Sequence, residues 1–266
     1  MTERILEIKD QWEATKMEHG EDVAPSLVIP VIYSGSSTDG EYIAKLLTGF
    51  MYAGGILKKT SPHHEDFLYF GVPYTAPYDR NFSSIQALYN HVKNAGGYYG
   101  SYRGAVLIDV TLWRSHFRER YFDVLLAYVA DQRSNGLIPF IYTDYCDSEP
   151  EMQELEAIAS SYFSVRRICV GAKDFCEYAV SLLKDKGIVI DESARLYLEE
   201  FFQESMKSVL FYGIVTVGRI CKEVAGKCGV GRACSFLDRD HLKAIITEFG
   251  YLDIYRDRPG TMMGFR

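Results

Sequence analysis

The chain has 266 residues, of which 29 are Lys or Arg and 36 are Asp or Glu, so its formal net charge at pH 7 is −7. This length suggests one large domain or two small ones, with enough core to fold without disulfide bonds. The acidic balance argues against a protein that binds nucleic acid by neutralising phosphates. No apolar run approaches the roughly 20 residues of a membrane span, and the N-terminus MTERILEIKDQW is unlike a signal peptide. We therefore expect a cytoplasmic protein without membrane contact.

Short apolar segments and amphipathic segments alternate over the first 170 residues. The spacing of apolar residues predicts helices at 3–19, 41–53, 119–133 and 151–161, and strands at 26–33, 105–108, 137–142 and 165–170. Pro30 is unusual inside a strand, because proline donates no ladder hydrogen bond. Strands that alternate with helices predict a parallel sheet with helices on both faces.

From residue 174 onward we expect helices and no strands. The predicted helices lie at about 174–187, 191–207, 212–226 and 238–249, and Asp191 stands where an N-cap residue belongs. The sequence thus predicts an α/β core over residues 1–172 and a small α-helical lid domain over residues 173–266.

Tyrosine and phenylalanine are abundant between residues 67 and 103. Tyr98, Tyr99 and Tyr102 stand among three glycines in this stretch. Such a segment can form an exposed recognition loop, or its rings can fill gaps over the core. The sequence leaves both interpretations open.

Ligands of an open parallel sheet bind at the carboxyl ends of the strands. Three segments fall there in this chain: the Ser34–Gly40 stretch, which reads as a loop, then Asp109, and then Thr143 with Asp144. A glycine-bearing loop between a strand and a helix is where backbone amides form a phosphate cradle.

The Ser34–Gly40 stretch has the glycine spacing of a phosphate loop without its charged residues. The functional pattern is G-x-x-x-x-G-K-[ST], in which the lysine neutralises phosphates and the hydroxyl holds Mg²⁺. Gly35 and Gly40 keep the spacing, but Glu41 and Tyr42 occupy the lysine and hydroxyl positions. At ~4 Å and an effective dielectric near 20, each reversal of charge is worth several kcal/mol. We expect no ordinary ATP binding here, and a structural turn is the simpler interpretation of the glycines.

The order of motifs resembles the AAA+ ATPases of the stage V sporulation protein K and red-type Rubisco activase group. The segment KDQWEATKMEHGEDVAPSLVIPVIYSGSSTDGEYIAKLLTGFMYAGGIL is similar to that group's entry helix, first strand, phosphate loop and following helix. FGVPYTAPYDR resembles the central-pore segment, RGAVLIDVTLW the Walker B strand, LIPFIYTDY the sensor strand and SSYFSVRRICV the arginine-finger strand. FYGIVTVGRICKEV resembles the lid helix with the second sensor, and MMGFR the group's ending. The resemblance covers nearly the whole chain and implies a P-loop NTPase (AAA+) type sheet with a helical lid.

The resemblance also implies that the group's catalytic residues have been lost. Family members have Lys and Thr at the positions of Glu41 and Tyr42. Asp109 keeps the Walker B aspartate, whereas Val110 replaces the glutamate that polarises the attacking water, and Thr216 stands at the second-sensor arginine. The degenerate nucleotide site implied in this way comprises Gly35, Gly40, Glu41, Tyr42, Asp109, Asp144 and Thr216.

The arginine fingers of the group fall near Ser160 and Tyr162 in this chain. If the alignment is wrong by one residue, Arg166 or Arg167 would serve as a displaced finger and Arg219 as a displaced sensor. An arginine finger contributes roughly 10³–10⁵ in rate, so its loss together with the other groups would leave essentially no hydrolysis.

We therefore interpret the chain as a pseudo-ATPase with no catalytic residues, no metal site and no cofactor. It would act as an assembly, adaptor or regulatory subunit through protein contacts, for example with an active AAA+ paralogue in a hetero-oligomeric ring. Phe70 and Tyr74, near the pore-loop position, are candidate partner contacts, with core packing as the alternative.

The alternative function is an ATPase with weak, non-standard Mg-ATP binding and slow hydrolysis. Asp109 and Asp144 would then hold Mg²⁺ through their carboxylates, and Lys58 or Lys59 would replace the missing lysine. A different small-molecule site on the same kind of sheet is a third possibility, although the chain lacks G-x-G-x-x-G.

Overall fold

The computed structural model describes residues 2–58, 67–72, 83–95, 102–116, 120–144, 149–208, 210–230 and 236–251. The chain divides into two compact units, Met1–Cys169 and Val170–Arg266, each of which is described by itself below. The predicted fold class is confirmed, because a parallel sheet flanked by helices is followed by a helical region.

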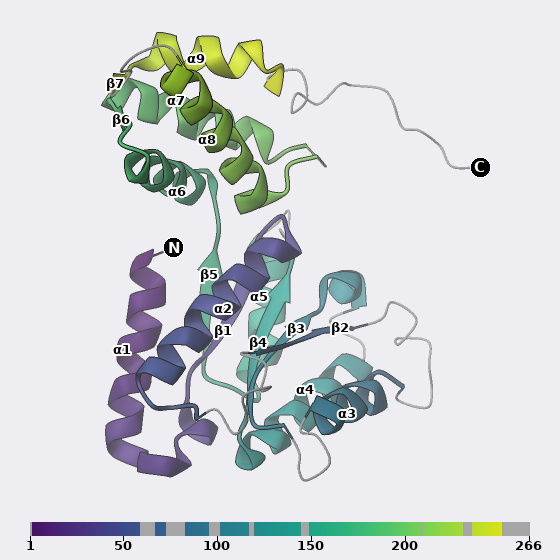
Figure 1. The fold of residues 1–266 in the computed structure, drawn as a ribbon. Coiled ribbons are helices and arrows are strands. Elements are labelled where there is room, and N and C mark those ends of the chain that lie inside the picture. Colours follow the sequence, from purple (N-terminus) through teal and green to yellow (C-terminus); the bar gives the residue numbers. More distant parts are fainter. Residues whose placement is uncertain are drawn as a thin grey trace, which may run out of the picture. The chain divides into compact units, whose positions relative to one another are not determined.

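The first unit is built on five parallel strands in the spatial order β2-β3-β4-β1-β5 (Figure 1). The strands are β1 (Ile29–Tyr33), β2 (Phe67–Gly71), β3 (Gly104–Asp109), β4 (Leu137–Thr143) and β5 (Val165–Cys169). Four of the five were predicted from their apolar runs. The prediction missed β2, whose side chains are alternately buried and exposed as befits an edge strand, unlike the fully buried β1 and β4.

Pro30 is accommodated because of where the pairing of β1 begins. β1 pairs with β5 along Ile29–Tyr33, but its register with β4 starts only at Val31. The missing N–H of the proline therefore costs no bond in the β1–β4 ladder.

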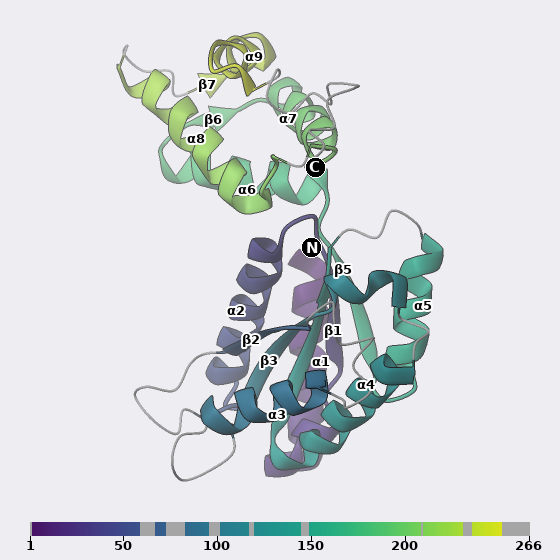
Figure 2. The same cartoon turned by 90° about the vertical axis from the view of Figure 1, so that its right-hand side faces the viewer.

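Helices cover both faces of the sheet (Figures 1 and 2). On one face, Trp12 stacks on Phe140 with ring centroids 6.1 Å apart, and its indole N–H donates to the Val28 carbonyl at 2.7 Å. The opposite face carries an apolar cluster that includes Leu88, Leu125 and Leu155 of three further helices. The helices are α1 (Thr2–His19), α2 (Ser37–Ala53), α3 (Ser83–Ala95), α4 (Arg120–Gln132) and α5 (Glu149–Ser160), with short 3₁₀ turns at Gly20–Asp22, Ala24–Ser26, Thr111–His116 and Arg133–Asn135.

The aromatic stretch at 67–103 is in part regular structure. It contributes β2 and α3, neither of which the sequence predicted, and both Phe70 and Tyr102 belong to the core cluster. The Phe70 and Tyr102 rings therefore pack in the core and do not form an exposed recognition loop. Tyr74, Tyr98 and Tyr99 lie outside the described residues.

The second unit contains four helices close to the predicted ranges. They are α6 (Ala172–Asp185), α7 (Glu192–Ser205), α8 (Gly213–Val230) and α9 (Arg239–Glu248). The Asp191 carboxylate accepts from the Ala194 N–H at 2.7 Å, which confirms the predicted N-cap. The expectation that strands stop at residue 174 is wrong, because β6 (Val189–Ile190) and β7 (Phe236–Leu237) form a short parallel pair. Two residues per strand are too few for apolar periodicity to reveal.

Candidate functional site

The link between β1 and α2 is shorter than the predicted loop. We expected a loop from Ser34 to Gly40 and a helix from Glu41, but α2 begins at Ser37. Ser36 is extended, with φ −145° and ψ 130°, and serves as the N-cap residue. Asp39 lies in the first turn, where a carboxylate interacts favourably with the helix dipole. The polar residues that resemble a loop by composition therefore start a helix.

This early helix start uses up backbone amides that a phosphate cradle would need. The N–H groups of Asp39 and Gly40 both donate to the Ser36 carbonyl, at 3.0 Å and 3.4 Å. A cradle requires successive N–H groups that point at the anion without an internal partner. Only Ser34, Gly35 and Ser36 separate the strand from the helix, so little chain remains to wrap a phosphate.

The ring of Tyr142, on β4, packs against the start of α2. A Cβ atom added at Gly40 would meet the ring Cδ2 atom at 2.5 Å, so only glycine fits there. The buried Tyr142 hydroxyl donates to the Ser34 carbonyl at 2.9 Å, and the Ser34 hydroxyl donates to an Asp39 oxygen at 2.5 Å. Burial raises the pKa of Tyr142 well above its usual range, and the nearby carboxylates, Asp109 first, raise that pKa further. A neutral ring and a buried carboxylate thus lie beside the link between β1 and α2.

The two side chains at the lysine and hydroxyl positions of a phosphate loop, Glu41 and Tyr42, are both exposed on α2. Lys58 lies beyond the far end of α2 and pairs with Glu21 at 3.0 Å. The helix is 17 residues long, which is roughly 25 Å at 1.5 Å per residue. The Lys58 side chain is much shorter than this distance and therefore does not replace the missing lysine. Lys59 lies outside the described residues.

The structure brings Asp109 and Asp144 together at the carboxyl ends of β3 and β4, as expected. The Thr111 N–H donates to Asp109 Oδ1 at 2.9 Å, and the Thr111 hydroxyl accepts from the Asp144 N–H at 3.0 Å. Asp109 Oδ2 accepts from the Tyr69 hydroxyl at 2.5 Å. Both oxygens of Asp109 therefore already have protein donors. Across the described ranges, no three His, Cys, Asp or Glu side chains are grouped to hold a metal ion.

Tyr69 is a site residue that the sequence analysis missed. Burial raises the pKa of its hydroxyl above the usual range, and the hydrogen bond to Asp109 adds to this shift. Tyr69 and Asp109 are 40 positions apart, and nothing in the pattern around Tyr69 pairs it with a carboxylate. Of the two candidate partner contacts, Phe70 is only 8% exposed and packs near the His91 ring, while Tyr74 is not described.

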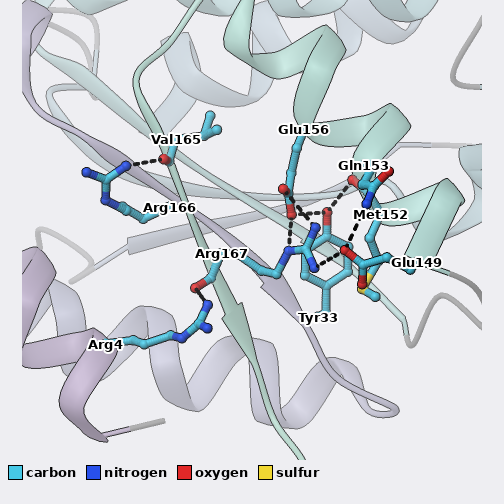
Figure 3. A network of polar contacts seen from close by, with 9 residues as sticks. All are labelled: Arg4, Tyr33, Glu149, Met152, Gln153, Glu156, Val165, Arg166 and Arg167. Carbon is cyan, nitrogen blue, oxygen red and sulfur yellow. Dashed lines mark hydrogen bonds and ion pairs between the residues drawn. The ribbon is translucent and has the colours of Figure 1, made fainter.

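Arg167, a possible displaced finger, is held inside its own chain (Figure 3). Its guanidinium donates to Glu156 Oε1 at 2.6 Å and to Glu149 Oε1 at 2.7 Å, and it lies 5.9 Å from the Tyr33 ring centroid. These carboxylates raise the pKa of Arg167. Its cation is thus neutralised locally. Arg166 is exposed, and its guanidinium donates to the carbonyl of Val165 at 3.3 Å.

Thr216, at the expected second-sensor position, is buried within the second unit. Its hydroxyl accepts from the Tyr212 N–H at 2.9 Å, a local contact at the start of α8. Arg219, the possible displaced sensor, lies over the Tyr251 ring at 5.6 Å. Both contacts are internal to the second unit.

None of the helices in the described part of the chain is both long and apolar enough to cross a membrane. No protein-family model matches this chain, and no curated protein does.

Solved structures with a distantly similar fold are AAA+ proteins. A RuvB variant from Thermotoga maritima is 14% identical over 95% of this chain and 72% of its own, with a TM-score of 0.49. The Bacillus subtilis DNA clamp loader delta protein is 10% identical over 90% of this chain and 62% of its own, with a TM-score of 0.38. PCH-2 from C. elegans is 12% identical over 94% of this chain and 68% of its own, with a TM-score of 0.40.

Proposed function

We propose that this chain is a pseudo-ATPase, a protein with an AAA+-like fold that acts through protein contacts and does not use ATP. The observation that carries the proposal is the packing of Tyr142 against Gly40, with its hydroxyl bound to the Ser34 carbonyl. This contact lies on the segment where a phosphate loop would have to open.

Charge supports the same conclusion. Asp39 is 1% exposed and Glu41 stands at the lysine position, so an incoming triphosphate would meet two carboxylates and no lysine. Each unfavourable pair at ~4 Å is worth several kcal/mol at an effective dielectric near 20. Val110 and Thr216 stand where the resemblance expects a water-polarising glutamate and a sensing arginine, so catalysis would be missing as well.

We further propose that the relatives of this chain lie in the stage V sporulation protein K and red-type Rubisco activase group. The order of the resembling segments supports this assignment. The protein would work in the cytoplasm as an adaptor, as a regulatory subunit, or beside an active AAA+ paralogue in a mixed ring.

Calorimetric titration with Mg-ATP tests the proposal, because binding in the low micromolar range would contradict it. We expect no saturable heat up to 1 mM nucleotide, about a thousandfold weaker than micromolar binding. Phosphate release is measured in parallel on the wild type and on Asp109→Asn. Release above background that falls in Asp109→Asn would establish the alternative, a slow Mg-dependent ATPase.

A further inference from the structure

The outer edge of β2 has backbone groups without a hydrogen-bond partner among the described residues. The Val72 N–H donates to the Asp109 carbonyl at 2.9 Å, so alternation along the strand turns the N–H and C=O groups of Tyr69 and Gly71 away from β3. Within the described ranges, no group donates to them or accepts from them. An extended segment of another protein can pair with such an edge by main-chain hydrogen bonds.

The opposite edge of the same sheet is covered. The outward carbonyl of Arg167, on β5, accepts from the Arg4 guanidinium at 3.0 Å, and that of Val165 accepts from Arg166 at 3.3 Å (Figure 3). Long cationic side chains are a known way to prevent strand addition. In the part of the chain that the structure describes, the β5 edge is capped by arginines and the β2 edge is not.

The surface beside the β2 edge is partly apolar. Tyr69, on β2 itself, is 39% exposed and offers its ring as contact area to a segment that lies along the strand.

The charge beside this edge is negative. Asp109 accepts the hydrogen bond from the Tyr69 hydroxyl, and Glu41 is exposed on α2, a helix that packs against β2. Neither has an ion pair with a described Lys or Arg, and Lys45, one turn after Glu41, has none with it. A cationic occupant would supply the missing countercharges.

We propose that the β2 edge, with Tyr69, Glu41 and Asp109, binds an extended basic segment of a partner protein, which adds to the sheet as a sixth strand. This proposal deepens the proposed function, because it names the class of partner. A second copy is disfavoured as occupant, since residues 1–169 carry 22 acidic and 15 basic side chains and two such units repel each other.

Three synthetic peptides test the proposal on the full chain by fluorescence anisotropy at 50 and 150 mM salt. The first is acetyl-Gly-Arg-Val-Arg-Val-Arg-Gly-amide, for which we expect saturable binding with a Kd below about 1 mM that weakens with salt. The second has glutamate in place of arginine, and the third has every valine and arginine N-methylated, which removes the N–H donors from both edges of the peptide and blocks pairing with a strand. We expect neither of these to bind. Equal binding of either one, or no binding of the first, would overturn the proposal.

Variants locate the site. Gly71→Pro removes the outward N–H of Gly71 and should weaken the first peptide about three- to tenfold. Glu41→Gln should weaken it about two- to fivefold, and it stays informative if the proline variant does not fold. Glu7→Gln, on the exposed face of α1, is the matched control and should leave the affinity unchanged. Unchanged affinity in Glu41→Gln, or an equal loss in Glu7→Gln, would place the peptide elsewhere.

Two further outcomes separate this proposal from the proposed function. Concentration-dependent dimerisation in sedimentation, lost in Gly71→Pro, would show that a second copy occupies the edge and would overturn the assignment to a basic partner. Tight Mg-ATP binding together with peptide binding would refute the pseudo-ATPase and leave the β2 surface standing.

Discussion

The two edges of the five-stranded sheet are stabilised by opposite means. At β5, arginines reach back to backbone carbonyls, and the Arg167 side chain is held by two glutamates of α5. At β2, the Tyr69 hydroxyl donates to Asp109 of the neighbouring strand, and no described residue bonds to the outer backbone groups of Tyr69 and Gly71. A long, flexible cationic side chain can reach the backbone carbonyls at the edge of a strand. The Tyr69 ring stands on the face of the sheet, so its hydroxyl reaches only the neighbouring strand.

The difference in charge follows from these contacts. The β5 edge presents the exposed cations Arg4 and Arg166, while the β2 edge has Glu41 and Asp109 without described cationic partners. One sheet thus has an edge protected against pairing and an edge whose charge selects a partner. Substitutions at the two edges test this difference.

Arg167→Met should have the largest effect on stability. It removes the guanidinium that binds Glu156 and Glu149. The Glu156 carboxylate, only 21% exposed, then keeps the Tyr33 hydroxyl as its donor among the described residues. We expect a loss of about 1–2 kcal/mol in the free energy of unfolding, measured by urea denaturation, which is below the value for a fully buried pair because solvent screens this one. Arg166→Met is the matched control and should change stability by less than about 0.5 kcal/mol. Equal losses in both variants would mean that the network does not anchor β5.

The same variant has a pH signature. The hydrogen bond from Arg167 lowers the pKa of Glu149 below its ordinary value of 4.5. A lowered carboxyl pKa contributes stability that is present above the ordinary value and is lost as pH falls through the lowered one. We therefore expect the loss of stability between pH 5 and pH 3 to be shallower in Arg167→Met than in the wild type. A parallel pH profile would contradict this cause of the shift.

Tyr69→Phe should have a smaller effect at the other edge. The variant keeps the ring and removes the hydroxyl that donates to Asp109 Oδ2, while Oδ1 keeps the Thr111 N–H. Because this site is half-exposed and water can replace the donor, we expect a loss of about 0.5–1 kcal/mol in urea denaturation. Tyr89→Phe on α3 is the control, because this tyrosine is comparably exposed and its hydroxyl has no hydrogen bond to a described residue. A loss as large as that of Arg167→Met would show that β2 is held as firmly as β5.

Buried strands were predictable from the sequence, and contacts between distant segments were not. Continuous apolar runs revealed β1 and β4, but the half-exposed pattern of β2 contains too few buried positions to stand out. The start of α2 was misjudged because Gly35, Ser36 and Gly40 suggest a loop, whereas an extended N-cap residue and a first-turn carboxylate favour a helix. The packing of Tyr142 on Gly40 joins residues 102 positions apart, and no local pattern encodes it.

Arg4→Ala should have the smallest effect on stability and still test the comparison. It removes one exposed hydrogen bond to the Arg167 carbonyl, so the free energy of unfolding should change by less than about 0.5 kcal/mol. The double variant Arg4→Ala, Arg166→Ala tests whether these arginines prevent pairing at the β5 edge. If they do, the double variant should bind the uncharged strand-forming peptide acetyl-Gly-Thr-Val-Thr-Val-Thr-Gly-amide more tightly than the wild type does. Gly71→Pro in the same background separates the edges, because it disables β2 and leaves β5 intact. If Gly71→Pro abolishes peptide binding in this background, the peptide binds at β2 and not at β5. The shape of the β5 edge, and not its charge, would then prevent pairing there.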